Sequence, residues 1–98
     1  MVAASVCAAD LAPAPAAAAG PPATVRFATF NASLNRNNLG QLAAELAVPG
    51  SDQPDTVAEI IQRARPDVLL INEFDFDPVA LQRFQDNYLE VAHGTAAA

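Results

Sequence analysis

The strongest constraint on the fold is how little of the 98-residue chain can build a hydrophobic core. Residues 1–23 are mostly Ala, Pro, Gly and Val, a composition that buries too little apolar surface to offset the entropy of ordering it. Bulky apolar side chains become frequent only from Thr24 onward. We therefore expect a disordered leader or signal-peptide remnant over 1–23, one small module over 24–92, and an unstructured tail over 93–98.

Charge and cysteine content narrow the classes of function. Eleven acidic residues against five basic ones give a net charge of −6, which repels a polyanion unless a metal ion or a local Arg cluster intervenes. The single Cys7 excludes an intrachain disulfide and a CxxC zinc motif. No apolar run reaches the ~18 residues of a membrane-spanning helix. The leader favours a secreted or periplasmic location, and a cytoplasmic one is the alternative.

Two segments of the module have the pattern of β-strands. Thr24–Phe30 alternates between two faces and is rich in β-branched and aromatic residues. Asp67–Asn72 is a continuous apolar run, which predicts a strand covered on both faces. The Asn content of Asn31–Asn38 predicts a loop after the first strand.

Three amphipathic segments predict helices, over Leu39–Ala47 with Asn38 as its cap, from Asp55 or Thr56 to Arg65, and from Pro78 onward. The apolar stripe of the first helix consists of Leu39, Leu42, Ala43 and Leu46, and that of the third consists of Val79, Leu81, Phe84 and Tyr88. Thr56 and Glu59 have the spacing of a capping box, and Asp77 is placed to cap the third helix. The resulting order is strand, helix, helix, strand, helix. Two strands joined through helices are most easily placed parallel and adjacent, so the predicted fold class is α/β.

A polar side chain stands at the end of each predicted strand, Asn31 after the first and Glu73 after the second. The carboxyl ends of parallel strands form the edge at which open α/β sheets bind ligands. A carboxylate beside a carboxamide suits Mg²⁺ (or Mn²⁺) and the phosphoryl oxygen bound to it, and Asp75 could add a ligand. The ordinary alternative is that these are solvated turn residues. Arg36 could likewise contact a phosphate or only solvent.

The same strand ends resemble the first two motifs of the endonuclease/exonuclease/phosphatase family, the DNase I-like phosphoesterases. Val25–Asn31 (VRFATFN) is similar to a strand ending in T-x-N, and Arg65–Glu73 (RPDVLLINE) to P-D-[VI]-h-x-x-Q-E, with Asn72 where Gln is common. The resemblance implies that Glu73 binds the metal and that Asn31 lies near metal and phosphate. It also implies a four-layered α/β/β/α sandwich, of which this chain is the N-terminal part.

The activity implied by the resemblance is metal-dependent hydrolysis of a phosphoester in nucleic acid, a phospholipid headgroup or a small phosphate ester. The family's later motifs have no counterpart here, and the only histidine, His93, matches none of them. Whether the chain is an enzyme by itself is therefore open, and a missing C-terminal half is a possible partner. The alternative is a non-catalytic α/β module that needs a partner chain to complete its core, since its strand edges are unpaired. A third interpretation is a structural fragment without a ligand.

Overall fold

The computed structural model describes residues 23–98, so the predicted leader lies outside it except for Ala23. The elements follow in the predicted order, with a π-helical turn added at the end: β1 (Phe27–Leu34), α1 (Gln41–Glu45), α2 (Asp52–Ala64), β2 (Val68–Phe74), α3 (Pro78–Phe84) and η3 (Gln85–Leu89). Within this range no helix is long and apolar enough to cross a bilayer. The fold class is mixed α/β.

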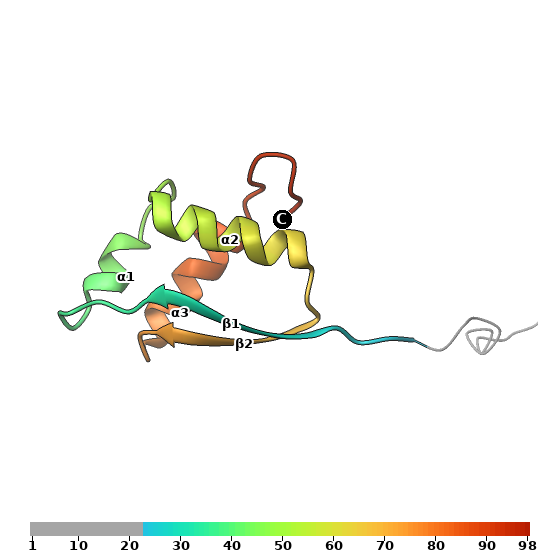
Figure 1. Cartoon of the computed structure of the whole chain (residues 1–98). Coiled ribbons are helices and arrows are strands. Elements are labelled where there is room, and N and C mark those ends of the chain that lie inside the picture. The colour runs from blue at the N-terminus through green and yellow to red at the C-terminus, as the bar shows by residue number, and fades with distance from the viewer. Residues whose placement is uncertain (1–22) are drawn as a thin grey trace, which may run out of the picture.

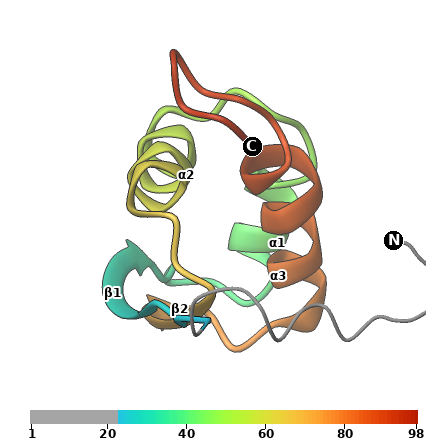
Figure 2. The same ribbon diagram turned by 90° about the vertical axis from the view of Figure 1, so that its right-hand side faces the viewer.

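The two strands form a parallel sheet in which Phe27 pairs with Val68 and Asn31 with Asn72. The helices lie to one side of this sheet, as the two views in Figures 1 and 2 show. Side chains that face the helices, including Phe30 and Ile71, pack against the core. The molecule thus has one layer of helices on one face of a two-stranded sheet.

The core is centred on Phe84 and Tyr88, which are both almost completely buried. The Phe84 ring stacks on Tyr88 with a centroid separation of 5.9 Å and meets Phe74 of β2 edge-on at 5.7 Å. The Tyr88 hydroxyl donates a hydrogen bond to the Val48 carbonyl at 2.8 Å and accepts one from the Ser51 backbone N–H at 3.2 Å. These contacts connect the last helical segment to both the sheet and the turn before α2.

The start of α3 confirms the predicted cap. Asp77 Oδ1 accepts hydrogen bonds from the Val79 and Ala80 backbone N–H groups at 2.9 and 3.3 Å, and Pro78 occupies the first turn. An Asp at this position satisfies donors that have no partner inside the helix. The apolar stripe expected on α3 is partly wrong, because Val79 and Leu81 are exposed and Ala80 is buried instead.

The first helix is shorter than predicted. Gly40 adopts a φ of 80° and α1 begins only at Gln41, so Asn38 is not the cap. Leu39, expected on the buried stripe, is fully exposed, whereas Leu42 and Ala43 are buried. The left-handed turn at Gly40 separates Leu39 from the helix and explains the difference.

The second helix starts earlier than predicted, at Asp52. Pro54 fits its first turn, where a backbone N–H has no helical acceptor. The predicted capping box is wrong, since the Thr56 hydroxyl donates to the Asp52 carbonyl one turn back, inside the helix. The buried face is centred on Val57, Ala58 and Ile61.

The prediction that both faces of the second strand are covered is also wrong. Val68 is 49% exposed and Leu70 is 61% exposed, on the side opposite to the helices. Their neighbour on β1, Phe27, is 72% exposed. Nothing within residues 23–98 covers this apolar face. We call it the open face and define it by Phe27, Thr29, Val68 and Leu70.

Residues 93–98, predicted to be unstructured, fold back toward α2. His93 and Ala96 form an antiparallel bridge, and Arg65 at the end of α2 donates to the carbonyls of Ala97 and Ala98. His93 Nε2 lies 2.8 Å from the Tyr88 carbonyl oxygen. The tail is therefore fastened to the end of η3 and to α2.

Candidate functional site

The carboxyl ends of β1 and β2 meet at a β-bulge. After the Asn31–Asn72 pair, the next paired residues are Leu34 and Phe74, so two residues of β1 oppose one residue of β2. The opposed residues include Ser33 and Glu73, which have φ angles of 51° and 53°. Left-handed backbone costs a residue with a side chain roughly 1 kcal/mol. Two such residues on adjacent strands make this edge the most strained part of the sheet.

Asn31 lies inside β1, not after its end as the sequence predicted. Its side-chain Oδ1 accepts hydrogen bonds from the Ser33 backbone N–H at 3.1 Å and the Ser33 hydroxyl at 3.4 Å. This turn holds the carboxamide in place and leaves its Nδ2 without an acceptor among residues 23–98. The Asn31 side chain is exposed and is thus available as a hydrogen-bond donor.

Glu73 is exposed and is the penultimate residue of β2, not the residue after the strand as the sequence predicted. It follows Asn72, which pairs with Asn31. The Glu73 carboxylate accepts no hydrogen bond from the residues that the structure describes. Asn72, exposed beside Asn31, is a second carboxamide that sequence reasoning did not assign to the site. The motif comparison noted Asn72 where Gln is common, and the strand register adds that it lies directly opposite Asn31. The structure therefore brings two carboxamides and one free carboxylate to the same edge.

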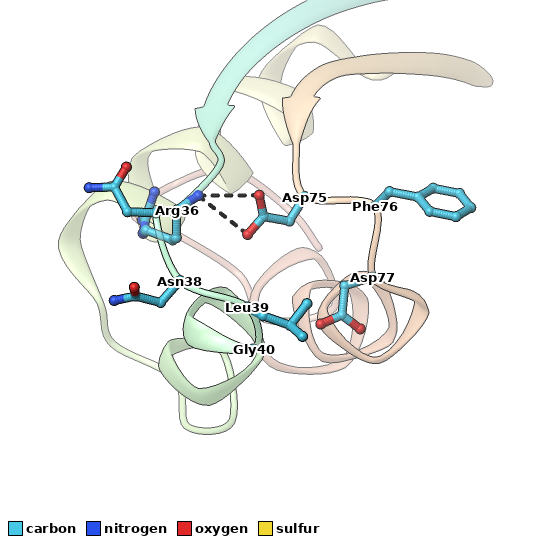
Figure 3. Close-up of a pocket in the computed structure, with 8 residues that line it drawn as sticks. Arg36, Asn38, Leu39, Gly40, Asp75, Phe76 and Asp77 are labelled. Carbon is cyan, nitrogen blue, oxygen red and sulfur yellow. Dashed lines mark hydrogen bonds between the residues drawn. The ribbon is translucent and has the colours of Figure 1, made fainter.

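Asp75 lies in the loop after β2 and is engaged differently. Both of its carboxylate oxygens accept the Arg36 backbone N–H, at 3.2 and 3.3 Å (Figure 3). Its own backbone N–H donates to the Leu34 carbonyl at 3.3 Å. Asp75 thus ties together the loops that follow β1 and β2. Its role as a metal ligand stays a prediction.

The Arg36 side chain is fully used inside the protein. Its Nε donates to Glu45 Oε1 at 2.9 Å and its Nη2 to Gln53 Oε1 at 2.8 Å. The Ser51 hydroxyl donates to Glu45 Oε2 at 2.7 Å. The hydrogen bond from Arg36, followed by that from Ser51, lowers the pKa of the Glu45 carboxyl below its ordinary value of 4.5. Arg36 therefore fastens its loop to α1 and α2, which makes contact with a phosphate unfavourable.

A cavity of about 250 Å³ lies between the loop of residues 36–40 and residues 75–77. Its wall includes the Asp75 and Asp77 carboxylates, and two fully exposed apolar side chains, Leu39 and Phe76, stand at its rim (Figure 3). Asn31 and Glu73 do not line this cavity. The strand-end site and the cavity are thus neighbouring but separate features of the same edge.

Comparison with known proteins identifies no family for this chain, so the function has to be inferred from its residues. No family model, curated protein or solved structure matches the chain. Within residues 23–98 no three or more His, Cys, Asp and Glu side chains gather as a metal centre. Mg²⁺ commonly uses only one or two protein carboxylates and keeps several waters. The side-chain oxygen atoms of Glu73, Asn31 and Asn72 are of the kind that Mg²⁺ binds, whereas tetrahedral zinc sites are built mainly from Cys and His.

Proposed function

We propose that the carboxyl edge of the β1–β2 sheet is half of the active site of a metal-dependent phosphoester hydrolase. The observation that carries the proposal is the Glu73 carboxylate, which has no partner among residues 23–98 and belongs to a residue with strained backbone next to the Asn31–Asn72 pair. Strained residues cluster at functional sites, and an exposed carboxylate without a protein partner can bind a cation at no cost in broken contacts. The motif resemblance assigns the same two residues, Asn31 and Glu73, to metal and phosphate.

Each side chain has a role that follows from its contacts. Glu73 would bind Mg²⁺ or Mn²⁺, and a bound metal would polarise the phosphoryl oxygen. Asn31, whose Oδ1 is held by Ser33, would donate its Nδ2–H to a phosphate oxygen. Asp75 would act outside the metal's ligands by fixing the two loops.

A group that activates the attacking water is not part of this edge within residues 23–98. His93 is engaged elsewhere, with Nε2 2.8 Å from the Tyr88 carbonyl and Nδ1 3.8 Å from the Asp55 carboxylate. We therefore propose that the chain is the N-terminal part of a four-layered sandwich, completed by a C-terminal half. The open face supports this proposal, since a second sheet would cover Phe27 and Leu70.

Titration of the ¹⁵N-labelled chain with Mg²⁺ or Mn²⁺ tests the metal site by NMR. We expect selective shifts at Asn31, Asn72 and Glu73, and their loss in Glu73→Gln. Glu90→Gln is the control, because Glu90 is also an exposed glutamate, lies remote in sequence from both strands and has only Gln85 as a side-chain hydrogen-bond partner among residues 23–98. A folded protein that shows no shifts at millimolar metal would contradict the proposal. Equal shifts in Glu73→Gln would do the same.

The open face also favours a second candidate function, that of a non-catalytic module whose sheet is completed by a partner chain. Three large apolar side chains exposed side by side are more than scattered surface residues. This candidate needs no metal, so the titration separates it from the first. The substrate and the secreted or periplasmic location both stay predictions.

A further inference from the structure

We infer that Gln53 and Ser33 position the Asn31 carboxamide, so that its Nδ2 group is held outward as a hydrogen-bond donor. This role rests on the proposed function, which supplies the acceptor, a phosphoryl oxygen. Neither Gln53 nor Ser33 contacts the substrate, so both are positioning residues. They connect the first turn of α2 to the carboxyl end of β1.

The Ser33 backbone N–H fixes which end of the Asn31 carboxamide faces the protein. Asn31 Oδ1 accepts this N–H at 3.1 Å and the Ser33 hydroxyl at 3.4 Å, which uses both lone pairs of the oxygen. The reversed carboxamide would turn its own NH₂ group toward the same N–H, and two donors would then face each other. Nδ2 is therefore the group that Asn31 offers to a ligand. It suits a phosphate oxygen and leaves the metal to the oxygens of Glu73 and Asn72.

Gln53 in turn holds the Ser33 backbone at its carbonyl group. Gln53 Nε2 donates to the Ser33 carbonyl at 2.7 Å, and Gln53 Oε1 accepts from Arg36 Nη2 at 2.8 Å. A carbonyl only accepts and a guanidinium only donates, so the Gln53 carboxamide has a single favourable orientation. The other side-chain donor to this carbonyl among residues 23–98, Arg36 Nη1, is more distant, at 3.5 Å.

Ser33 depends on this support because its backbone is strained. Its φ of 51° lies in the left-handed region, which is unfavourable for a residue with a side chain. The same conformation directs its N–H toward Asn31. Gln53 therefore stabilises the backbone that orients Asn31. A donor that is already ordered loses less freedom on binding, so this support should strengthen the contact with phosphate.

Gln53→Glu tests the inference with a side chain of the same shape. The carboxylate can still accept from Arg36 but cannot donate to the Ser33 carbonyl. Gln41→Glu is the matched control, because Gln41 is also an exposed residue in the first turn of a helix, and its Oε1 accepts from Asn38. Both variants add one negative charge and keep the acceptor oxygen of the original side chain.

¹⁵N relaxation of the Asn31 side-chain Nδ2 group measures its order without any ligand. We expect an order parameter above about 0.6 in the wild-type chain and in Gln41→Glu, and a lower value in Gln53→Glu. Gln53→Met, which cannot donate and adds no charge, should show the same fall. Each variant replaces an exposed side chain, so the core stays intact. Unchanged order in both Gln53 variants would overturn the inference, as would a wild-type Asn31 as mobile as the exposed Asn37.

Titration with inorganic phosphate in the presence of Mg²⁺ measures the effect on binding. We expect the Kd for phosphate to rise about two- to tenfold in Gln53→Met, because the carboxamide must then be ordered on binding. A Kd equal to that of the wild-type chain would overturn the inference. Mg²⁺ should still shift Glu73 in this variant. A wild-type chain that responds to neither Mg²⁺ nor phosphate would contradict the proposed function instead, and the order of Asn31 would still decide whether Gln53 positions it.

Discussion

The two faces of the β1–β2 sheet carry similar side chains and have opposite surroundings. Phe30 of β1 and Ile71 of β2 point toward the helices and pack against the core. Phe27, on the other face of β1, and Leu70, on the other face of β2, remain mostly exposed. Hydrophobic side chains on both sides of a strand thus do not tell which side is covered in this chain. The position of the helices decides it. Mutations of equal chemistry on the two faces should therefore have unequal effects.

The largest difference in stability should be between a phenylalanine truncated in the core and one truncated on the open face. Phe84→Ala removes a ring that is 1% exposed and contacts both Phe74 and Tyr88, so we expect a loss of about 3–5 kcal/mol in the free energy of unfolding. Phe27→Ala should cost less than about 0.5 kcal/mol, because the side chain is already largely in water. Urea unfolding measures both values. Equal losses would show that the open face is covered within the monomer.

Removal of the buried Tyr88 hydroxyl should have an intermediate effect on the free energy of unfolding. Tyr88→Phe leaves the Val48 carbonyl and the Ser51 backbone N–H without their partner, which we expect to cost about 1–2 kcal/mol. Thr29→Val on the open face removes an exposed hydroxyl and should change stability by less than about 0.5 kcal/mol. Thermal unfolding compares the two variants. Amide exchange at Ser51 should become faster in Tyr88→Phe alone, and unchanged exchange there would contradict the assigned hydrogen bond.

The ion pair between the loop after β1 and α1 should give a smaller, pH-dependent effect. Because the folded pKa of Glu45 lies below 4.5, its charged form stabilises the fold above that pH, and this contribution is lost as pH falls through the folded pKa. Glu45→Gln should therefore lower stability by about 1 kcal/mol at pH 7 and by progressively less in acid. Unfolding midpoints from pH 7 to pH 3 measure the trend.

The control for this pH series is Glu90→Gln, which changes an exposed glutamate away from Arg36. It should leave stability nearly constant over the same range. A Glu45→Gln effect that persists at pH 3 would mean that the neutral side chain, not its charge, supports the loop.

Local rules predicted the elements whose causes are local. Asp77 followed by Pro78 specifies the start of α3 within four residues, and the cap geometry confirms it. The parallel pairing of the two strands follows from the helices between them. The predicted burial of Leu39 is wrong because the left-handed turn at Gly40, which follows it, separates Leu39 from the helix. The prediction that both faces of β2 are covered is wrong because an apolar run indicates that burial is favourable but does not indicate which element covers each face.

The candidate site was likewise predictable only where it depends on local sequence. The residue types at the strand ends indicated Asn31 and Glu73 as neighbours, since parallel strands present their carboxyl ends at one edge. The contribution of Asn72 depends on the strand register, and the anchoring of Asp75 depends on where the Arg36 backbone runs. Both are long-range features that no local pattern encodes.

The smallest expected effect concerns the bulge at which the open face ends. Glu73→Gly and Ser33→Gly each place a residue without a side chain at a positive φ, which should raise the free energy of unfolding by about 0.5 kcal/mol once the greater entropy of the unfolded glycine is subtracted. Both variants relieve the same backbone strain, but only Glu73→Gly removes the carboxylate. The NMR response to Mg²⁺ should therefore be lost in Glu73→Gly and kept in Ser33→Gly. A fall in the stability of Glu73→Gly would show that the Glu73 side chain has a structural partner, and the strain would then need no function to explain it.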